Sequence, residues 1–288
     1  MLSLRITESE LRSGVMSPDH LAAATAALND DGLVVLEDVI DPSHLDILRE
    51  RMFVDLREVL DRSDAPFNFN TGNVQQDPPP FPPYLFRDIV VNDFTIAVTK
   101  SILGAGMKNT FYSGNTALPS KNRQPVHVDS GQLWPNLAVA TPAYQLVVNI
   151  PVVNVDATNG STEIWLGTHR DTTVAVQDGD SKVPLDALER RRLVSAPIQP
   201  TIRLGSAIIR DMRLWHAGMP NHTNSPRPML ALIHTVSWWQ DGRIVFAKGS
   251  EPFLEHPDLR TNAVFTDGPI SHNRNNERYD VQTESTGR

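Results

Sequence analysis

From residue 108 to residue 238 the chain is a succession of short extended segments separated by Gly, Pro and Asn. Each segment has the length and the β-branched or aromatic content that indicate a strand. A run of eight short strands is typical of two facing sheets closed into a jelly roll. The expected strands are 108–118, 126–129, 144–153, 162–166, 196–204, 206–211, 216–219 and 229–238.

The region before residue 108 is expected to lay helices against the outside of this barrel. Apolar residues recur at helical spacing in 17–30, 42–62 and 88–103, and 32–40 has the character of a strand. A chain of 288 residues with these patterns fits one elaborated domain better than two. We therefore expect a mainly β, cupin-like double-stranded β-helix with flanking helices.

The expected domain has three parts. Residues 1–107 would hold the helices, one strand and a Pro-rich lid loop, and residues 108–240 the jelly-roll core, interrupted by an insertion at 171–194 that contains a charged helix. The six prolines in 65–84 exclude a central strand or helix there, which leaves a surface loop or a lid. The polar tail at 249–288 is expected to be disordered, or ordered on closure or dimerisation, and a homodimer is compatible with it.

Composition excludes several classes of function. The formal net charge of -8 and the pI near 5.6, without a basic run, argue against a nucleic-acid partner. The absence of cysteine excludes disulfides and thiolate zinc sites. No apolar stretch reaches the length of a membrane span, and no signal peptide is evident, so we expect a cytoplasmic protein with no membrane partner.

The segment around His127 and Asp129 is the strongest chemical signal. Two residues apart on an extended strand, their side chains project to the same face and can bind one metal ion. His216, at the end of a later apolar run, offers a third ligand. Two histidines and one carboxylate form the facial triad of non-haem Fe(II) oxygenases, which leaves positions open for co-substrate and O2.

Four His-x-Asp pairs occur in the chain, so this choice has to be argued. The pair at His44 falls in an expected helix, where residues two apart point to different sides. The pair at His256 spans a proline. His169 and Asp171 are the serious rival, because His216 follows them as well, and this alternative stays open here.

The ordered set of motifs resembles a known family. His127-x-Asp129, the Thr-Asn-Gly-Ser-Thr turn at 158–162, Gly-Thr-His at 167–169, His216 and Arg227 are similar to the phytanoyl-CoA dioxygenase-like (PhyH) family of Fe(II)/2-oxoglutarate oxygenases, especially its natural-product-tailoring members. The resemblance covers about residues 32–239. It implies Fe(II), 2-oxoglutarate and O2 as cofactors and co-substrates, with release of succinate and CO2.

The resemblance also implies roles for further residues. Arg227 would meet the distal carboxylate of 2-oxoglutarate with two parallel hydrogen bonds, since a buried carboxylate needs such a partner. Gln124 and Thr162 match residues that hydrogen-bond 2-oxoglutarate, and Asn73 matches one that approaches the substrate. Further candidates for the substrate pocket, chosen from the pattern of polar and aromatic residues, are Tyr112, Gln145 and Trp134.

The expected function is oxidation of a small molecule by hydroxylation, desaturation or oxidative cyclisation, with an amino acid, alkaloid or terpenoid of secondary metabolism as substrate. Halogenation is disfavoured, because halogenating members of the family have a small residue in place of Asp129. The alternative is a cupin-like metal-binding protein or a metal-dependent isomerase. Such a protein would keep the three ligands but would have no need of Arg227.

Overall fold

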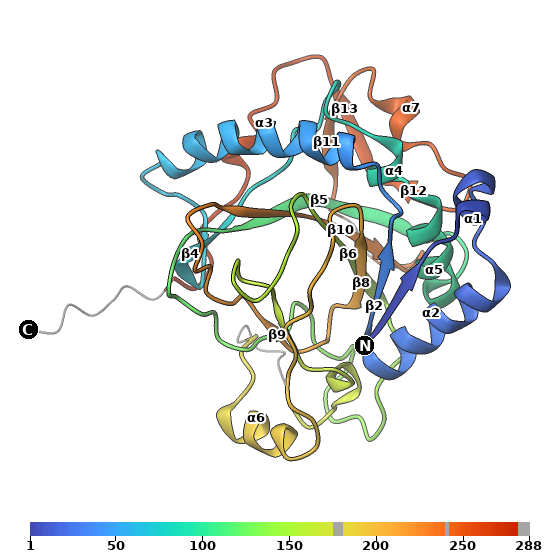
Figure 1. The fold of residues 1–288 in the computed structure, drawn as a ribbon, viewed down its shortest axis with the longest axis vertical. Coiled ribbons are helices and arrows are strands. Elements are labelled where there is room, and N and C mark those ends of the chain that lie inside the picture. The colour runs from blue at the N-terminus through green and yellow to red at the C-terminus, as the bar shows by residue number, and fades with distance from the viewer. Residues whose placement is uncertain (175–180, 240–241, 282–288) are drawn as a thin grey trace, which may run out of the picture.

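A computed structural model describes residues 1–174, 181–239 and 242–281 as a mixture of helices and strands around one large sheet (Figure 1). The strands are β1 (Leu2–Arg5), β2 (Leu33–Glu37), β3 (Phe67–Asn68), β4 (Asn70–Gln75), β5 (Lys108–Ala117), β6 (Gln145–Pro151), β7 (Glu163–Ile164), β8 (Ala207–Asp211), β9 (His216–Ala217), β10 (Arg227–Thr235), β11 (Ile244–Ala247), β12 (Arg260–Thr261) and β13 (Ala263–Thr266). The helices are α1 (Glu8–Ser13), α2 (Pro18–Asp31), α3 (Pro42–Leu60), α4 (Arg87–Val90), α5 (Asp93–Leu103), α6 (Leu185–Arg192) and α7 (Glu251–Leu254), with 3-10 turns η1 (Thr168–Arg170) and η2 (His272–Arg274).

The large sheet runs in the order β1-β2-β8-β6-β10-β5-β4-β3, with β12 beside β5. Its central strands are antiparallel, and their side chains alternate between two faces. On β6, Leu146, Val148 and Ile150 belong to the main hydrophobic core, whereas Val147 and Asn149 line an internal cavity. One face of the sheet therefore builds the core and the other face builds the cavity.

Helices cover the core face, as the periodicity predicts. Helix α2 packs on α5 and on β2, and α3 runs across the opposite end of the sheet (Figure 1). Ser17 and Asp41 cap the starts of α2 and α3. The expected helix at 88–103 is two helices, because Asn92 leaves the helical conformation and caps α5 with its side chain. These helices make the fold mixed α/β, whereas we expected it to be mainly β.

The second sheet is smaller than expected. Within the described part of the chain, β7 and β9 alone form a ladder there, and the expected strands 126–129 and 196–204 are joined to it by isolated bridges. His127 exchanges both backbone hydrogen bonds with His216, but the next amides of that segment donate to Ser181 and Met212 in loops. The ladder therefore ends after one pair, and the expectation of full strands at these two places was wrong.

The Pro-rich region contains a hairpin. Strands β3 and β4 pair with each other, and β4 pairs with β5 at the edge of the large sheet. The prolines do not interrupt it because they lie outside the paired residues, at 66 and from 78 onward. The expected loop at 65–84 is thus in part a strand hairpin that forms one wall of the molecule.

Residues 249–281 of the C-terminal region contain α7, β12, β13 and η2, where the polar sequence predicted a tail that is disordered, or ordered on closure or dimerisation. Residues 272–281, which we name the C-terminal strap, cross from α3 to the β3–β4 hairpin. His272 Nε2 lies 2.9 Å from Asp55 Oδ2, and Arg62 Nη1 donates to the Asn273 carbonyl at 2.8 Å. Tyr279 pairs with the hairpin through two backbone hydrogen bonds. Buried polar contacts, rather than an apolar face, attach this segment to the rest of the molecule. The hydrophobic pattern of the sequence therefore does not predict its position.

The described helices include none with both the length and the apolar content that a bilayer crossing requires. Part of the expected insertion, residues 175–180, lies outside the described residues, as do 240–241 and 282–288. The charged helix expected within that insertion is α6, which projects from the body of the molecule (Figure 1).

Candidate metal centre

The structure brings His127, Asp129 and His216 together. One ligand atom from each lies within 4.8 Å of the others, and they are the only such group of His, Asp and Glu found among the described residues. Asp129 Oδ1 is 3.5 Å from His216 Nε2 and 4.0 Å from His127 Nε2. Two nitrogens and one oxygen thus converge on a single point, as a facial triad requires.

Backbone contacts fix the orientation of both imidazoles. His127 Nδ1 lies 2.9 Å from the carbonyl of Pro125, and His216 Nδ1 lies 3.0 Å from that of Leu214. A carbonyl can only accept, so each Nδ1 carries the hydrogen and each Nε2 presents a lone pair to the centre. Both side chains are ready to bind a metal without a change of tautomer.

The two histidines are also kept uncharged. Burial is the main cause that lowers the pKa of His127 below its ordinary value and lowers the pKa of His216 well below it. The nearby guanidinium of Arg210 lowers both further. Neutral imidazoles are the form that binds a divalent metal.

The carboxylate of Asp129 is divided between two partners. Its Oδ1 faces the histidines, while its Oδ2 accepts a hydrogen bond from Nη2 of Arg210. Burial raises the pKa of this carboxyl, but the charge of Arg210, assisted by smaller contributions from the histidines, outweighs burial and leaves the pKa below its usual value. Asp129 is therefore ionised, and its solvent-accessible edge faces the internal cavity.

The cavity beside this cluster has a volume of about 270 Å³. It lies between the inner face of the large sheet and the segments that carry the three ligands, and Arg227 lines it from β10. Arg227 is 4% exposed, and its contacts are with neutral groups, chiefly the Gly160 carbonyl at 2.6 Å and the Asn159 carbonyl at 3.4 Å. Burial lowers its pKa to about 10.

Local turn chemistry positions those carbonyls. Asp156 Oδ1 accepts hydrogen bonds from the backbone amides of Thr158 and Asn159, which closes the turn that precedes Thr162. Gly160 has a φ of 82°, and a Cβ at that position would lie 2.8 Å from the Met219 carbonyl. The Asn-Gly turn can therefore approach Arg227 only with glycine at this residue.

Gln124 joins three segments of the cavity wall. Its Oε1 accepts from the amide of Gly218 at 2.8 Å, and its Nε2 donates to the Asn68 carbonyl at 3.2 Å. Both ends of the side chain are thus committed to backbone. A Cβ on Gly218 would lie 2.5 Å from Gln124 Oε1 and 2.9 Å from Asn73 Nδ2, so these side chains depend on the glycine.

The other residues expected at the site divide into two groups. Thr162 and Asn73 line the cavity, and Oδ1 of Asn73 is buried without a hydrogen-bond partner. Three candidates for the substrate pocket lie elsewhere: Tyr112 is in the core against Phe246, Gln145 is at the start of β6 outside the cavity lining, and Trp134 is 60% exposed on the surface. The expectation that these three line the pocket was wrong: strand alternation turns Tyr112 into the core, Gln145 lies on the cavity side of β6 but at its start, beyond the lining, and Trp134 stands on an open loop.

His169, the rival ligand, is not part of the cluster. It is buried in η1, and its Nε2 lies 3.1 Å from the Asn29 carbonyl. Its ring packs against the backbone of Gly32, where a Cβ would lie 2.5 Å from Nδ1. His169 therefore connects η1 to the end of α2.

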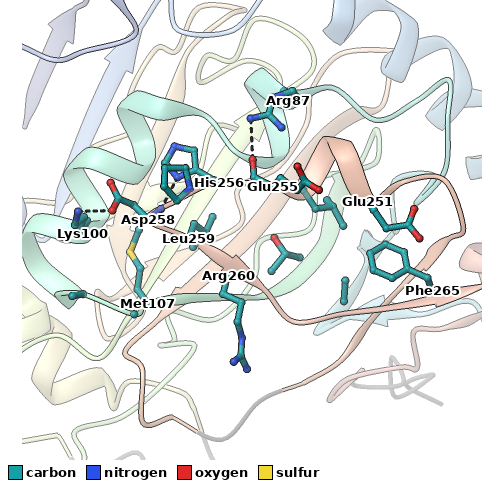
Figure 2. Close-up of a pocket in the computed structure, with 16 residues that line it drawn as sticks. Arg87, Lys100, Met107, Glu251, Glu255, His256, Asp258, Leu259, Arg260 and Phe265 are labelled. Atoms are coloured by element: carbon teal, nitrogen blue, oxygen red, sulfur yellow. Dashed lines mark hydrogen bonds and ion pairs between the residues drawn. The ribbon is translucent and has the colours of Figure 1, made fainter.

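A larger hollow of about 1000 Å³ lies on the outside of the molecule, near α5 and α7 (Figure 2). Its charged side chains are mostly engaged with each other or with backbone: Lys100 pairs with Asp258 at 2.5 Å, and Arg87 donates to the Glu255 carbonyl at 2.9 Å. No metal-binding group is found there among the described residues. Its size alone gives it no chemistry, and the smaller cavity is the candidate site.

Sequence reasoning missed Arg210. In β8, Ala-Ile-Ile-Arg-Asp, it is the charged residue on the inner face, where it follows Ile208, while Ile209 between them faces the core. A charged residue on the inward side of an apolar strand is costly unless it has a buried partner, and that pattern could have signalled its role.

The chain matches the model of one protein family, described as phytanoyl-CoA dioxygenase, over residues 28–229. The matched span includes the three residues of the cluster and also Arg210 and Arg227.

Several solved structures share the fold. AviO1 from Streptomyces viridochromogenes has a TM-score of 0.56 and 19% identity over 79% of this chain and 100% of its own. HygX from Streptomyces hygroscopicus, solved with nickel and 2-oxoglutarate, has a TM-score of 0.55 and 12% identity over 80% of this chain and 91% of its own. SnoK, a non-heme alpha ketoglutarate dependent carbocyclase from nogalamycin biosynthesis, has a TM-score of 0.54 and 15% identity over 77% of this chain and 84% of its own. At these identities the likeness concerns the fold.

Proposed function

Because this chain belongs to the phytanoyl-CoA dioxygenase family of Fe(II)/2-oxoglutarate-dependent dioxygenases, we propose that His127, Asp129 and His216 hold its ferrous ion. The observation that carries this assignment is the commitment of both Nδ1 atoms to backbone carbonyls, which leaves both Nε2 lone pairs and one carboxylate oxygen facing each other. We assign the large sheet and the small β7–β9 sheet as the two walls of the family's double-stranded β-helix. Since Fe(II) is maintained in a reducing compartment, we place the protein in the cytoplasm.

Arg227 is proposed to bind the distal carboxylate of 2-oxoglutarate. It is a buried cation that contacts carbonyls and a thioether but no acid among the described residues. A desolvated guanidinium without a counter-ion is expensive, and a carboxylate on the co-substrate supplies the missing partner. A cupin-like binding protein or an isomerase has no need of such a group, which is why Arg227 supports the oxygenase assignment.

The remaining cavity residues have supporting roles in this proposal. Gln124 holds the segment of the first two ligands to the segment after His216, and Thr162 and Asn73 offer hydrogen bonds to 2-oxoglutarate or substrate. Bound Fe(II) and 2-oxoglutarate supply, together with O2, the oxidising chemistry that releases succinate and CO2. The protein orients the ligands, excludes bulk water and positions the substrate carbon.

We propose that the substrate is a small polar molecule, such as an amino acid or an alkaloid, oxidised by hydroxylation, desaturation or cyclisation. The cavity wall carries amide side chains without hydrogen-bond partners, beside apolar side chains from the same sheet. A hydrocarbon-rich terpenoid would leave these amides unsatisfied. Among the described residues of this wall, the unpartnered oxygens are Oδ1 of Asn68 and of Asn73; Gln75 and Asn115 also line the cavity, and the apolar neighbours are Phe111, Val147 and Ile233.

An anaerobic titration with Fe(II) followed by 2-oxoglutarate tests the assignment. We expect a visible charge-transfer band in the wild type and in His169→Ala, and none in His127→Ala. Succinate formation in air should follow the same order. Bound iron without a band in the wild type would refute the oxygenase assignment, and a band that depends on His169 but not on His127 would show that the wrong pair was chosen.

A further inference from the structure

Arg210 is a second buried guanidinium at the proposed metal centre, and the facial triad does not explain it. It stands on β8 between β2 and β6, in register with Leu33 and Val147, and lines the cavity. Its side chain is 8% exposed. Nη2 donates to Oδ2 of Asp129, and Nη1 is buried without a hydrogen-bond partner.

This contact divides the carboxylate of Asp129 into two functions. Oδ2 is held by the guanidinium, so the oxygen left for a metal is Oδ1, the one that faces His127 and His216. The negative charge that would attract a cation is at the same time offset by Arg210. The empty centre therefore has good geometry for a metal but little net attraction for its charge.

The charges of the whole cavity point the same way. Among the described residues that line it, the charged side chains are Asp129, Arg210 and Arg227, and each histidine, with Nδ1 on a backbone carbonyl, presents Nε2 to the centre as a neutral ligand. Two guanidiniums against one carboxylate leave a surplus positive charge around the cavity, where both guanidiniums are buried and 31% of the Asp129 side chain is exposed. A divalent cation entering alone meets this surplus, whereas 2-oxoglutarate brings two negative charges and reverses it.

We propose that Arg210 is a positioning residue that couples metal binding to 2-oxoglutarate binding. Its positive charge weakens the affinity of the centre for the metal alone. The carboxylates of the co-substrate balance that charge when they bind. This inference rests on the proposed function of the site. Its unpartnered Nη1 is a donor that a metal-bound carboxylate can satisfy. Because coupling is reciprocal, the metal raises the affinity for 2-oxoglutarate by the same factor.

An opposing effect of Arg210 has to be weighed. By fixing Oδ2 it also reduces the rotamer freedom of Asp129, which favours metal binding. That gain concerns two torsion angles of one short side chain. The repulsion between a dication and a guanidinium that share one carboxylate acts at close range and is the larger effect. Removal of the charge should therefore strengthen, not weaken, binding of the metal alone.

Isothermal titration with Co(II), with and without saturating 2-oxoglutarate, tests the coupling. In the wild type we expect 2-oxoglutarate to raise the Co(II) affinity by about a hundredfold, within the range of strong coupling. In Arg210→Gln, Co(II) alone should bind about tenfold tighter than in the wild type, and the enhancement by 2-oxoglutarate should fall by about the same factor. Arg210→Lys retains the charge and should behave like the wild type.

Two controls separate this inference from simpler explanations. Arg227→Gln removes a positive charge of the same cavity that does not contact Asp129, and should change the affinity for Co(II) alone by only about twofold. Oxalate chelates the metal but has no distal carboxylate for Arg227, and its enhancement should still depend on Arg210. Arg210→Met replaces Arg210→Gln if the latter does not fold.

Equal or weaker binding of Co(II) alone in Arg210→Gln or Arg210→Met would overturn the coupling, and so would unchanged enhancement by 2-oxoglutarate. A wild type that binds no Co(II) under either condition would instead overturn the proposed metal site itself. The binding measurements need no turnover and no knowledge of the substrate.

Discussion

Arg210 and Arg227 line the same cavity from the same sheet, and both are almost fully buried. Arg210 has a carboxylate beside it, whereas the contacts of Arg227 are with carbonyl oxygens and a methionine sulfur. A buried cation paired with a protein acid is part of the scaffold and acts on that acid. A buried cation without an acid is completed only by a ligand. Under the proposed assignment, the difference separates an end of the cavity that would hold the metal from an end that would hold the co-substrate.

Turn geometry explains how the unpaired arginine is tolerated. The carbonyls of Asn159 and Gly160 take up two of its donors and leave others for a ligand. Burial lowers the pKa of Arg227 to about 10, because desolvation disfavours its charged form. In the proposed complex, a bound carboxylate would offset this desolvation.

The largest expected effect is that of Arg227→Met. It should lower the affinity of the metal-loaded protein for 2-oxoglutarate by about a thousandfold, since loss of one partner from a buried charge pair costs roughly 3–5 kcal/mol. Metal binding without 2-oxoglutarate should change little. The measurement is a 2-oxoglutarate titration of Ni(II)-loaded protein, and near-wild-type affinity would remove the distinction between the two arginines.

Asp129→Asn removes the carboxylate that pairs with Arg210, the other arginine of the comparison. Metal binding should be lost, and the free energy of unfolding of the metal-free protein should fall by about 3 kcal/mol, because Arg210 is left as an uncompensated buried charge. Chemical denaturation checks the second result. Arg227→Gln, which separates no ion pair among the described residues, is the matched control and should lower stability much less; equal losses would contradict the assignment of Arg210 as the paired cation.

Gly218→Ala tests whether the wall near His216 limits the co-substrate. The new Cβ would crowd Gln124 Oε1 at 2.5 Å and Asn73 Nδ2 at 2.9 Å, so these side chains must move. We expect about a tenfold loss of 2-oxoglutarate affinity, equivalent to roughly 1.4 kcal/mol. Gly268→Ala, whose Cβ would meet Thr266 Oγ1 at 3.6 Å, is the control and should have no effect. Wild-type affinity in Gly218→Ala would show that Gln124 and Asn73 are remote from the ligand.

The smallest effect is a pH dependence that belongs to Arg227 alone. Its pKa of about 10 in the empty site must rise when a carboxylate binds, so the complex holds more protons than the free protein above that pH. The affinity for 2-oxoglutarate should therefore be constant below pH 9 or so and fall about fourfold by about pH 10.5. Protein preloaded with Ni(II) and freed of excess metal is suited to this titration.

Oxalate separates that effect from a general response to alkali. It binds the metal but cannot reach Arg227, and its affinity should stay level over the same range. A parallel decline for both ligands would assign the pH dependence to the metal centre. At acid pH the end of the cavity that holds Asp129 responds. Because the pKa of Asp129 is lowered, its contribution to folding stability is present above the ordinary carboxyl pKa and is lost only as the pH falls below that value.

The parts of the site that follow from sequence are those set by local spacing. His127 and Asp129 share a face because they are two apart in extended backbone, and His216 ends an apolar run, so the cluster could be anticipated. The caps at Ser17 and Asp41 likewise locate two helices within one or two residues. These features depend on neighbours in the chain, which a single sequence displays.

The features that escaped prediction depend on contacts between distant segments. The role of Arg210 depends on its contact with Asp129, 81 positions away. The orientation of Tyr112 and Trp134 depends on strand register and an open loop. The small sheet was overestimated because its segments pair at single bridges, which local β-propensity cannot distinguish from a ladder. Tertiary context decided each of these cases.

The C-terminal strap is synthesised last, yet it packs beside the proposed metal site. Arg62 and Asn273 are 211 positions apart, and Tyr279 packs on Phe69, whose ring in turn lies 4.5 Å from that of His127. The ribosome therefore releases every proposed ligand of the iron before the strap, whose Tyr279 supports Phe69 beside His127. A chain interrupted before Ser271 would carry the complete set of proposed ligands without this support, so the last part of their surroundings to be made is the strap.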